Sequence, residues 1–288
     1  MGRREDTLLK AFTGLEGGVV AAGSTCGVVS GGAMGLALSH HDEIAEKGIP
    51  AQAALLSSVG EYVRWFQDRF GSSLCRERTG ADFYSAWGQF RYFVPGDRVS
   101  KCLWHIRGAA RHLHSCLQEK LPITEMESGG SANKPMHCAE AVLKGIRERT
   151  GVGDDLLEDL SFVFDGGVGL QGGVCGALAG AVMGLNVSIG MNVRDMSYFR
   201  ILKTFTVGHI NLLTDKPLGK PEPFSMGSEV VKEFTEAGGS MECRDITGRA
   251  FADWSAFQGY ISSSDKCSEL IKLATNQGSE AIKKHLQG

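Results

Sequence analysis

The cysteines of this 288-residue chain lie in a sequence that repeats itself, and this repeat limits the fold more than any other feature. Aligning Cys26 with Cys175 brings GGVVAAGSTCGVVSGGAMGL, residues 17–36, onto GGVGLQGGVCGALAGAVMGL, residues 166–185. Both segments read GG, G, CG, G and MGL in register. Such a repeat predicts two related structural units within one chain.

Two further pairs of cysteines continue the repeat in the same order. Cys75 and Cys243 lie in segments that share V, F, G, S, C, R, T, G and F. Cys102 and Cys267 follow at a similar distance, and each opens a segment with helical periodicity. Three cysteines in common order with matching flanks are not expected by chance, so we interpret the chain as an internal duplication.

The two copies differ in length and in completeness. Residues 121–136 include a Gly/Ser/Pro-rich stretch typical of a linker, which predicts an N-terminal copy over 1–120 and a C-terminal copy over 137–288. Cys75 and Cys243 are further apart in residue number than Cys26 and Cys175, which indicates an insertion in the second copy. We expect it as a surface loop around 215–226, where three of the seven prolines lie. The second copy also gains a helical segment from Cys138 that the first copy lacks.

The hydrophobic pattern indicates the class of fold. Leu55, Val59, Val63, Phe66 and Phe70 recur at helical spacing, whereas sustained alternation with a period of two is scarce. We therefore predict a mainly α fold of two tandem, related helical halves. A pseudo-two-fold axis should relate these halves, so that one chain forms a pseudo-dimer.

Charge and motifs exclude several classes of protein. The chain carries 30 Lys and Arg against 33 Asp and Glu, so it has no basic field for nucleic acid. Its eight cysteines include no C-x-x-C and no C-x-x-C-H, the patterns of zinc ribbons, thioredoxin-type dithiols and c-type haem attachment. It also lacks the G-x-S-x-G, Walker and HExxH motifs of hydrolases and phosphotransferases. Any shared cysteine site must be assembled from distant segments.

One segment, GVGLQG at 167–172, matches the dinucleotide-binding pattern G-x-G-x-x-G. The residues before it have helical rather than strand spacing, and its repeat partner at 18–23 lacks the middle glycine. We therefore expect no nucleotide site there. The eight histidines are expected mostly at the surface.

Glycine is abundant, with 39 residues, and part of this excess forms a ladder with a spacing of four. That spacing places a bare stripe on one face of a helix, and its cost of about 1 kcal/mol per glycine requires close packing in return. We expect the stripes to pack near the pseudo-two-fold axis. The ladder consists of Gly23, Gly27, Gly31 and Gly35 in the first copy and of Gly172, Gly176, Gly180 and Gly184 in the second.

Cys26 and Cys175 each lie where a glycine-rich loop enters the ladder helix. A helix N-terminus stabilises a thiolate through its dipole and its free N–H groups, so a cysteine there is a good metal ligand or nucleophile. An ordinary buried cysteine is the alternative at any single position. Repetition of the cysteines with their flanks favours a functional site.

The second copy resembles a family of redox-active proteins defined by four cysteines and a C-G-A-x-x-G motif. The motif stands here as Cys175-Gly176-Ala177-Leu178-Ala179-Gly180, preceded by C-A-E-A-V-L from Cys138 and followed by Cys243 and Cys267. The first copy is a diverged version, with Cys26-Gly27-Val28-Val29-Ser30-Gly31 and no leading cysteine segment.

The resemblance implies redox activity, and we expect Cys138, Cys175, Cys243 and Cys267 to form one centre. Four converging thiolates need a metal ion or cluster to balance their charge. An iron–sulfur cluster, 2Fe–2S or 4Fe–4S, is favoured by the redox resemblance, and zinc is the alternative. The chain would act as an electron-transfer partner of an oxidoreductase or cytochrome rather than as a stand-alone enzyme. A dithiol/disulfide redox protein and a structural zinc protein remain alternatives.

The first copy predicts a second centre on Cys26, Cys75 and Cys102, with its fourth ligand open. Cys116 is one candidate, but fourteen positions of continuous helix after Cys102 span about 21 Å, too far for one compact cluster. Cys138 could cross over from the second copy instead.

The chain starts MGRREDTLLK, where two arginines are followed at once by acidic residues, which makes a poor signal peptide. Its apolar stretches are broken by glycines and offer no run of about 20 strongly hydrophobic residues for a membrane span. We expect a cytoplasmic protein. A vestigial twin-arginine signal and a periplasmic location are the alternative.

Overall fold

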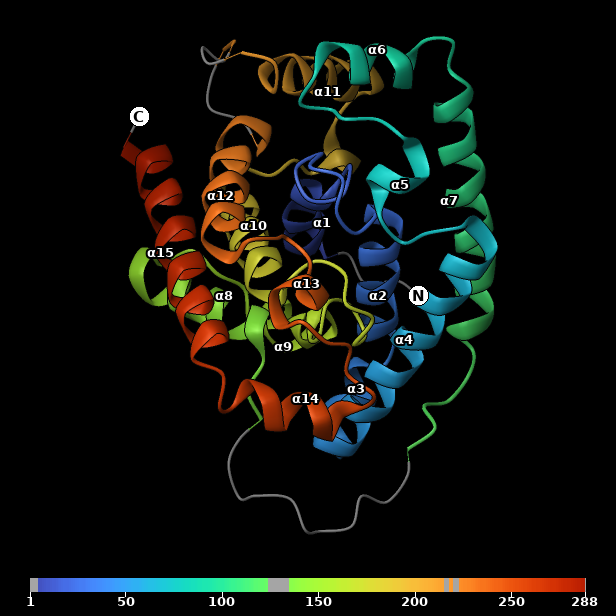
Figure 1. The fold of residues 1–288 in the computed structure, drawn as a ribbon, viewed down its shortest axis with the longest axis vertical. Helices are drawn as coiled ribbons and strands as arrows, with labels where there is room; N and C mark the ends of the chain where they lie inside the picture. Colours follow the sequence, from blue (N-terminus) through green and yellow to red (C-terminus); the bar gives the residue numbers. More distant parts are fainter. Residues whose placement is uncertain (1–4, 124–134, 215–217, 220–222, 288) are drawn as a thin grey trace.

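The architecture consists of α-helices joined by short turns (Figure 1). The computed structural model describes residues 5–123, 135–214, 218–219 and 223–287. Within these ranges the only β pairing is two isolated bridges. The prediction of a mainly α fold with two tandem helical halves is confirmed.

The first copy runs through seven α-helices. In chain order they are α1 (Asp6–Phe12), the 3₁₀ turn η1 (Thr13–Leu15), α2 (Gly27–Ser39), α3 (His41–Lys47), α4 (Ile49–Phe70), α5 (Cys75–Thr79), α6 (Ala86–Phe93) and α7 (Asp97–Cys116).

The second copy repeats this order from α9 to α15 and adds α8 in front. Its elements are α8 (Cys138–Thr150), α9 (Asp155–Leu160), η2 (Ser161–Phe164), α10 (Gly176–Ile189), η3 (Val193–Asp195), α11 (Tyr198–Asn211), α12 (Pro223–Gly238), α13 (Cys243–Thr247), α14 (Trp254–Ile261) and α15 (Asp265–Gln287). Among the described residues, α8 has no counterpart in the first copy.

The insertion in the second copy is not confined to a loop. Part of 215–226 lies outside the described residues, and its last residues begin α12. Additional length lies upstream of it, because η3 is new and α11 has 14 residues where its counterpart α3 has 7. Proline marked the loop in the sequence, but it could not show that a helix had also been lengthened.

Each copy contains an unusual left-handed turn in front of its ladder helix. Residues 17–21 all have φ between +52° and +82°, and residues 166–170 all have φ between +58° and +82°. L-amino acids avoid this conformation, at a cost of roughly 1–2 kcal/mol each, yet Val20 and Val168 adopt it. Val19, Ala21 and Leu170 adopt it as well, and glycine holds the other five positions at lower cost, so the two turns account for part of the glycine excess.

The two copies meet at equivalent positions. The backbone N–H of Val174 donates to Thr25 Oγ1 at 2.7 Å, and Thr25 is the residue that the repeat aligns with Val174. A residue that contacts its own equivalent lies on a two-fold axis. The axis therefore passes beside the turns that lead into α2 and α10.

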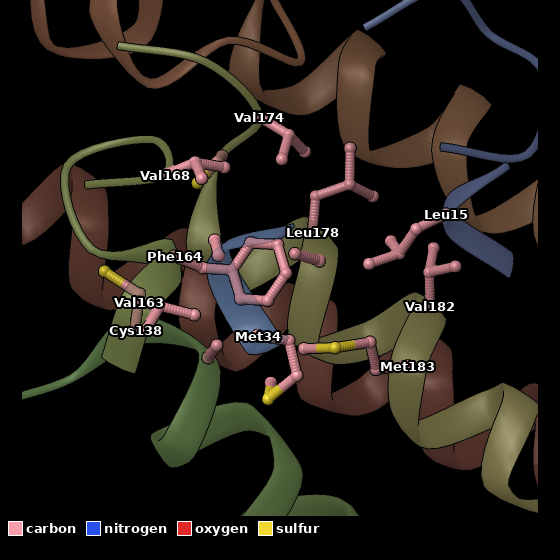
Figure 2. Close-up of a cluster of buried hydrophobic side chains, with 14 of the residues drawn as sticks. Leu15, Met34, Cys138, Val163, Phe164, Val168, Val174, Leu178, Val182 and Met183 are labelled. Carbon is pink, nitrogen blue, oxygen red and sulfur yellow. The ribbon is translucent and has the colours of Figure 1, made fainter. Parts of the chain in front are cut away.

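The hydrophobic core is shared between the copies. Figure 2 shows the ring of Phe164, at the end of η2, surrounded by Leu178 of α10 and Met34 of α2. The ring of Phe12 from α1 lies 6.2 Å from that of Phe164. Because both copies supply these contacts, the core is continuous from one half to the other.

The glycine ladder packs differently in the two copies. In α10 an added Cβ at Gly180 would lie 2.8 Å from the carbonyl oxygen of Ala139 in α8, so the stripe is a close contact. In α2 the same atom at Gly31 or Gly35 would meet nothing within 4 Å. The expected packing of both stripes is wrong in this respect, because α8 covers the stripe of α10 whereas Gly31 and Gly35 of α2 are uncovered. Gly23 and Gly172 do not belong to the helical stripes, because they precede α2 and α10 and have positive φ.

One segment, Gly176–Asp195, is long and apolar enough to cross a membrane by length and composition. Most of it is buried inside the protein, which is the property of a core helix.

Candidate functional site

The four cysteines of the second copy all lie at the beginning of a helix. Cys138 is the first residue of α8, Cys175 is the N-cap of α10, Cys243 is the first residue of α13 and Cys267 is in the first turn of α15. Each helix N-terminus carries about half a positive charge on unpaired N–H groups. The positions therefore favour negative charge on sulfur.

Backbone pairing fixes the positions of Cys175 and Cys243. Val174 and Glu242 form an antiparallel bridge, with the N–H of Cys175 donating to Met241 at 2.8 Å and the N–H of Cys243 donating to Gly173 at 2.7 Å. Both cysteines flank the bridge, so their side chains leave it on the same face. They are diagonal neighbours, for which Cα atoms lie about 7–8 Å apart.

The four thiols share one electrostatic neighbourhood. Burial raises the pKa of Cys138 well above its usual value, and negative charge on Asp165 and on the other three cysteines raises it further. Burial likewise raises the pKa of Cys243, and the charges of Cys175 and Cys267 add to this effect. Cys138 therefore lies within electrostatic range of Cys175, Cys243 and Cys267, and one centre on these four cysteines stays a prediction.

Backbone N–H groups at the start of α10 oppose the effect of burial on the pKa of Cys175. Burial raises the pKa of this thiol to about 11, although the N–H groups of Ala177 and Leu178 donate to the sulfur and lower it. Burial is the larger effect. Without a bound cation, the thiol at this position is therefore protonated at neutral pH.

A buried acid links two of the cysteine segments. Asp165, which follows η2, accepts from His137 Nδ1 at 2.7 Å and from the N–H of Cys138 at 3.3 Å. Asp165 is fully buried and burial raises its pKa, while the hydrogen bond from His137 lowers it. This contact fixes the start of α8 beside the left-handed turn that leads to Cys175.

Sequence reasoning missed this pair. The expectation that the histidines lie mostly at the surface is wrong for three of them, because His105, His137 and His209 are buried. The signal available in the sequence was the repeat itself, since Glu16 stands in the first copy where Asp165 stands in the second. Burial raises the pKa of Glu16 to about 8.

The first copy has the same backbone geometry. Thr25 and Leu74 form the equivalent bridge, the N–H of Cys26 donates to Ser73 at 2.8 Å, and the N–H of Cys75 donates to Ser24 at 2.8 Å. Burial raises the pKa of Cys75 to about 12, and negative charge on Cys26 and Cys102 contributes. Cys26 and Cys102 therefore lie within electrostatic range of Cys75, and a centre on this trio stays a prediction.

A buried arginine distinguishes the first copy. Arg78 donates to Cys26 Sγ at 2.7 Å and contacts Nδ1 of His105. The repeat aligns Arg78 with Ile246, so the second copy has an apolar side chain at this position. A guanidinium is always charged, and it supplies the first copy with a positive charge beside sulfur that the second copy lacks.

Cys116 lies apart from the trio. Helix α7 runs without interruption from Asp97 to Cys116, so Cys102 and Cys116 are separated by about 21 Å of helix. Cys116 Sγ lies 3.5 Å from Nε2 of His112, and both residues line a cavity of about 480 Å³. Cys138 lies with the second-copy cysteines, as described above.

The sulfurs of the second copy do not form a preformed site for a single ion. Among the residues that the structure describes, no three His, Cys, Asp or Glu side chains are placed to hold one metal ion. All eight cysteines are free thiols in the structure.

A family model described as "Putative redox-active protein (C_GCAxxG_C_C)" matches the chain twice, over residues 1–115 and 136–280. The chain belongs to this family. The two matches cover both copies, so the C_GCAxxG_C_C unit occurs here as a tandem duplication, as the repeat predicted. No curated protein and no solved structure gives a significant match. What the family model supports is redox activity carried by cysteines.

Proposed function

We propose that the second copy binds an iron–sulfur cluster through Cys138, Cys175, Cys243 and Cys267, and that the protein carries electrons for a partner oxidoreductase or cytochrome. The observation that carries this proposal is that four thiols, three of them buried, all lie at helix N-termini within electrostatic range of Cys138. Membership of the redox-active family agrees with it.

The electrostatics favour a cationic occupant. Burial keeps Cys138, Cys175 and Cys243 protonated when nothing is bound, because their pKa values are raised. A metal centre displaces those protons and balances the thiolate charge, while the helix N-termini stabilise the net negative charge that remains. The donor set of four sulfurs therefore fits a soft-metal centre.

The family favours a cluster over a single zinc ion. Zinc in proteins has no redox chemistry, so a zinc site would give the chain a structural role only. An iron–sulfur cluster held by four cysteines changes charge by one electron. The match to a redox-active family therefore supports the cluster.

The spacing disfavours a disulfide between the two cysteines fixed by the bridge. Disulfides join Cα atoms that are usually about 4.4–6.8 Å apart. Cys175 and Cys243, as diagonal neighbours, lie at or beyond this limit. A disulfide between these two cysteines would require backbone movement at the bridge.

A bound cluster supplies one-electron transfer. The protein residues hold and shield it. Phe164 and the surrounding core exclude water on one side, and Asp165 orients the start of α8 so that Cys138 faces the other cysteines.

We propose only one centre per chain. The first copy has three of the four cysteines and no counterpart of α8 among its described residues. Its buried Arg78 already places a positive charge beside Cys26 Sγ. This copy is therefore a structural partner of the second rather than a second redox site.

Anaerobic purification followed by absorption spectroscopy and elemental analysis tests the proposal. We expect a brown protein that absorbs at about 400 nm and contains iron and sulfide. A colourless protein with stoichiometric zinc would replace the proposal with a structural zinc site. A colourless, metal-free protein would replace it with dithiol chemistry.

A further inference from the structure

Helices α6 and α11 form a layer at one end of the long axis of the molecule (Figure 1). Gln89 of α6 donates to the carbonyl oxygen of His209 in α11 at 2.7 Å. The rings of Phe93 and Phe205 lie 6.0 Å apart in the same contact. The two helices are therefore held as one unit, although they come from different copies.

The layer exposes large apolar side chains. Trp87 and Phe90 of α6 are 66% and 52% exposed, and Tyr198, Phe199 and Leu202 of α11 are 74%, 81% and 50% exposed. We call these five residues the aromatic end surface. Soluble proteins rarely expose so many large side chains together without a binding role.

The equivalent helix of the second copy shows that this exposure is not a property of the repeat. Helix α14 corresponds to α6, and the repeat aligns Trp87 and Phe90 with Ser255 and Gln258. The second copy therefore has polar side chains where α6 exposes aromatic ones.

Basic residues lie on the same two helices and at the start of α7. Arg91 belongs to α6, Arg98 and Lys101 to the beginning of α7, and Arg194, Arg200 and Lys203 to η3 and α11. The acidic residues in these segments are Asp97 and Asp195, although the whole chain has a net charge of −3.

We propose that the aromatic end surface binds the headgroup region of an anionic lipid bilayer. Trp, Tyr and Phe favour the membrane–water interface, and nearby Lys and Arg are attracted to anionic lipids. A helix of 8 residues and one of 14 span about 12 and 21 Å, which is shorter than the hydrocarbon core of about 30 Å. The helices therefore lie on the bilayer and do not cross it.

Co-sedimentation of the full chain with phosphatidylcholine vesicles, with and without phosphatidylglycerol, tests the proposal. We expect binding that requires phosphatidylglycerol and weakens as salt is raised. The double variant Trp87→Ser/Phe199→Ser should bind at least about tenfold more weakly. Arg200→Gln/Lys203→Gln should lose about fivefold per charge removed.

Leu286→Ser is the matched control, because Leu286 is 60% exposed near the end of α15 and does not belong to the aromatic end surface. It should bind as the wild type does. Circular dichroism should show an unchanged fold for every variant, since all the replaced residues are exposed. No binding, or equal binding to neutral vesicles, would overturn the proposal. Self-association that is lost in Trp87→Ser/Phe199→Ser, without vesicle binding, would assign the surface to a second copy of the chain.

Discussion

At the scale of single residues, the two copies have the same backbone but different chemistry near sulfur. Arg78 in the first copy replaces Ile246, and Glu16 replaces Asp165. The sequence repeat identified the equivalent cysteines of the two copies, but not that Arg78 donates to Cys26 Sγ. That contact joins side chains 52 positions apart, and neither local pattern nor spacing reveals it.

Glu16 predicts a pH dependence of stability. Burial raises the pKa of its carboxyl from 4.5 to about 8, so the folded state holds a proton that the unfolded state releases. The contribution to stability is present below pH 4.5 and is lost as the pH rises towards 8. We expect Glu16→Gln to remove this loss, because glutamine does not ionise. The free energy of unfolding of the variant minus that of the wild type should therefore increase from pH 5 to pH 8.

Urea unfolding at several pH values measures this difference. A difference between variant and wild type that does not change over this range would show that Glu16 ionises normally in the folded protein.

At the scale of elements, the presence of helix α8 determines whether the glycine stripe of a ladder helix is covered. The sequence predicted helices with bare stripes, and it showed that the segment from Cys138 occurs once. It did not connect the two observations, because which face of α10 meets α8 depends on tertiary packing. The left-handed turns could not be predicted from the sequence either, since Val20 and Val168 are residues that avoid positive φ.

Gly180 and Gly31 occupy equivalent positions and predict opposite effects of alanine. Gly180→Ala places a methyl group 2.8 Å from the backbone of Ala139 and should destabilise the fold by about 1–3 kcal/mol. Gly31→Ala meets nothing within 4 Å and should stabilise α2 by about 0.5–1 kcal/mol. Urea unfolding of the two variants gives the comparison. Equal effects of the two substitutions on the free energy of unfolding would mean that α8 does not pack closely on the stripe of α10.

At the scale of the whole molecule, duplication allowed the copies to diverge while sharing one core. The second copy retains four coupled thiols and the helix that covers its glycine stripe. The first copy has lost the covering helix among its described residues and has gained Arg78. The order and class of the elements could be predicted from the repeat, because the same sequence pattern occurs in both copies. Which copy holds the proposed centre and which is its structural partner could not be predicted, because this depends on contacts that differ between the copies.

The central claim is that one iron–sulfur centre belongs to the second copy, and the equivalent residues Cys243 and Cys75 provide the direct test. Both begin a five-residue helix after the same kind of bridge. Iron content and absorbance at about 400 nm should be measured after anaerobic purification of Cys243→Ser and Cys75→Ser, with circular dichroism to confirm the fold. We predict that Cys243→Ser loses both signals and that Cys75→Ser retains them. Half of the iron in each variant, or iron retained in Cys243→Ser, would contradict the account.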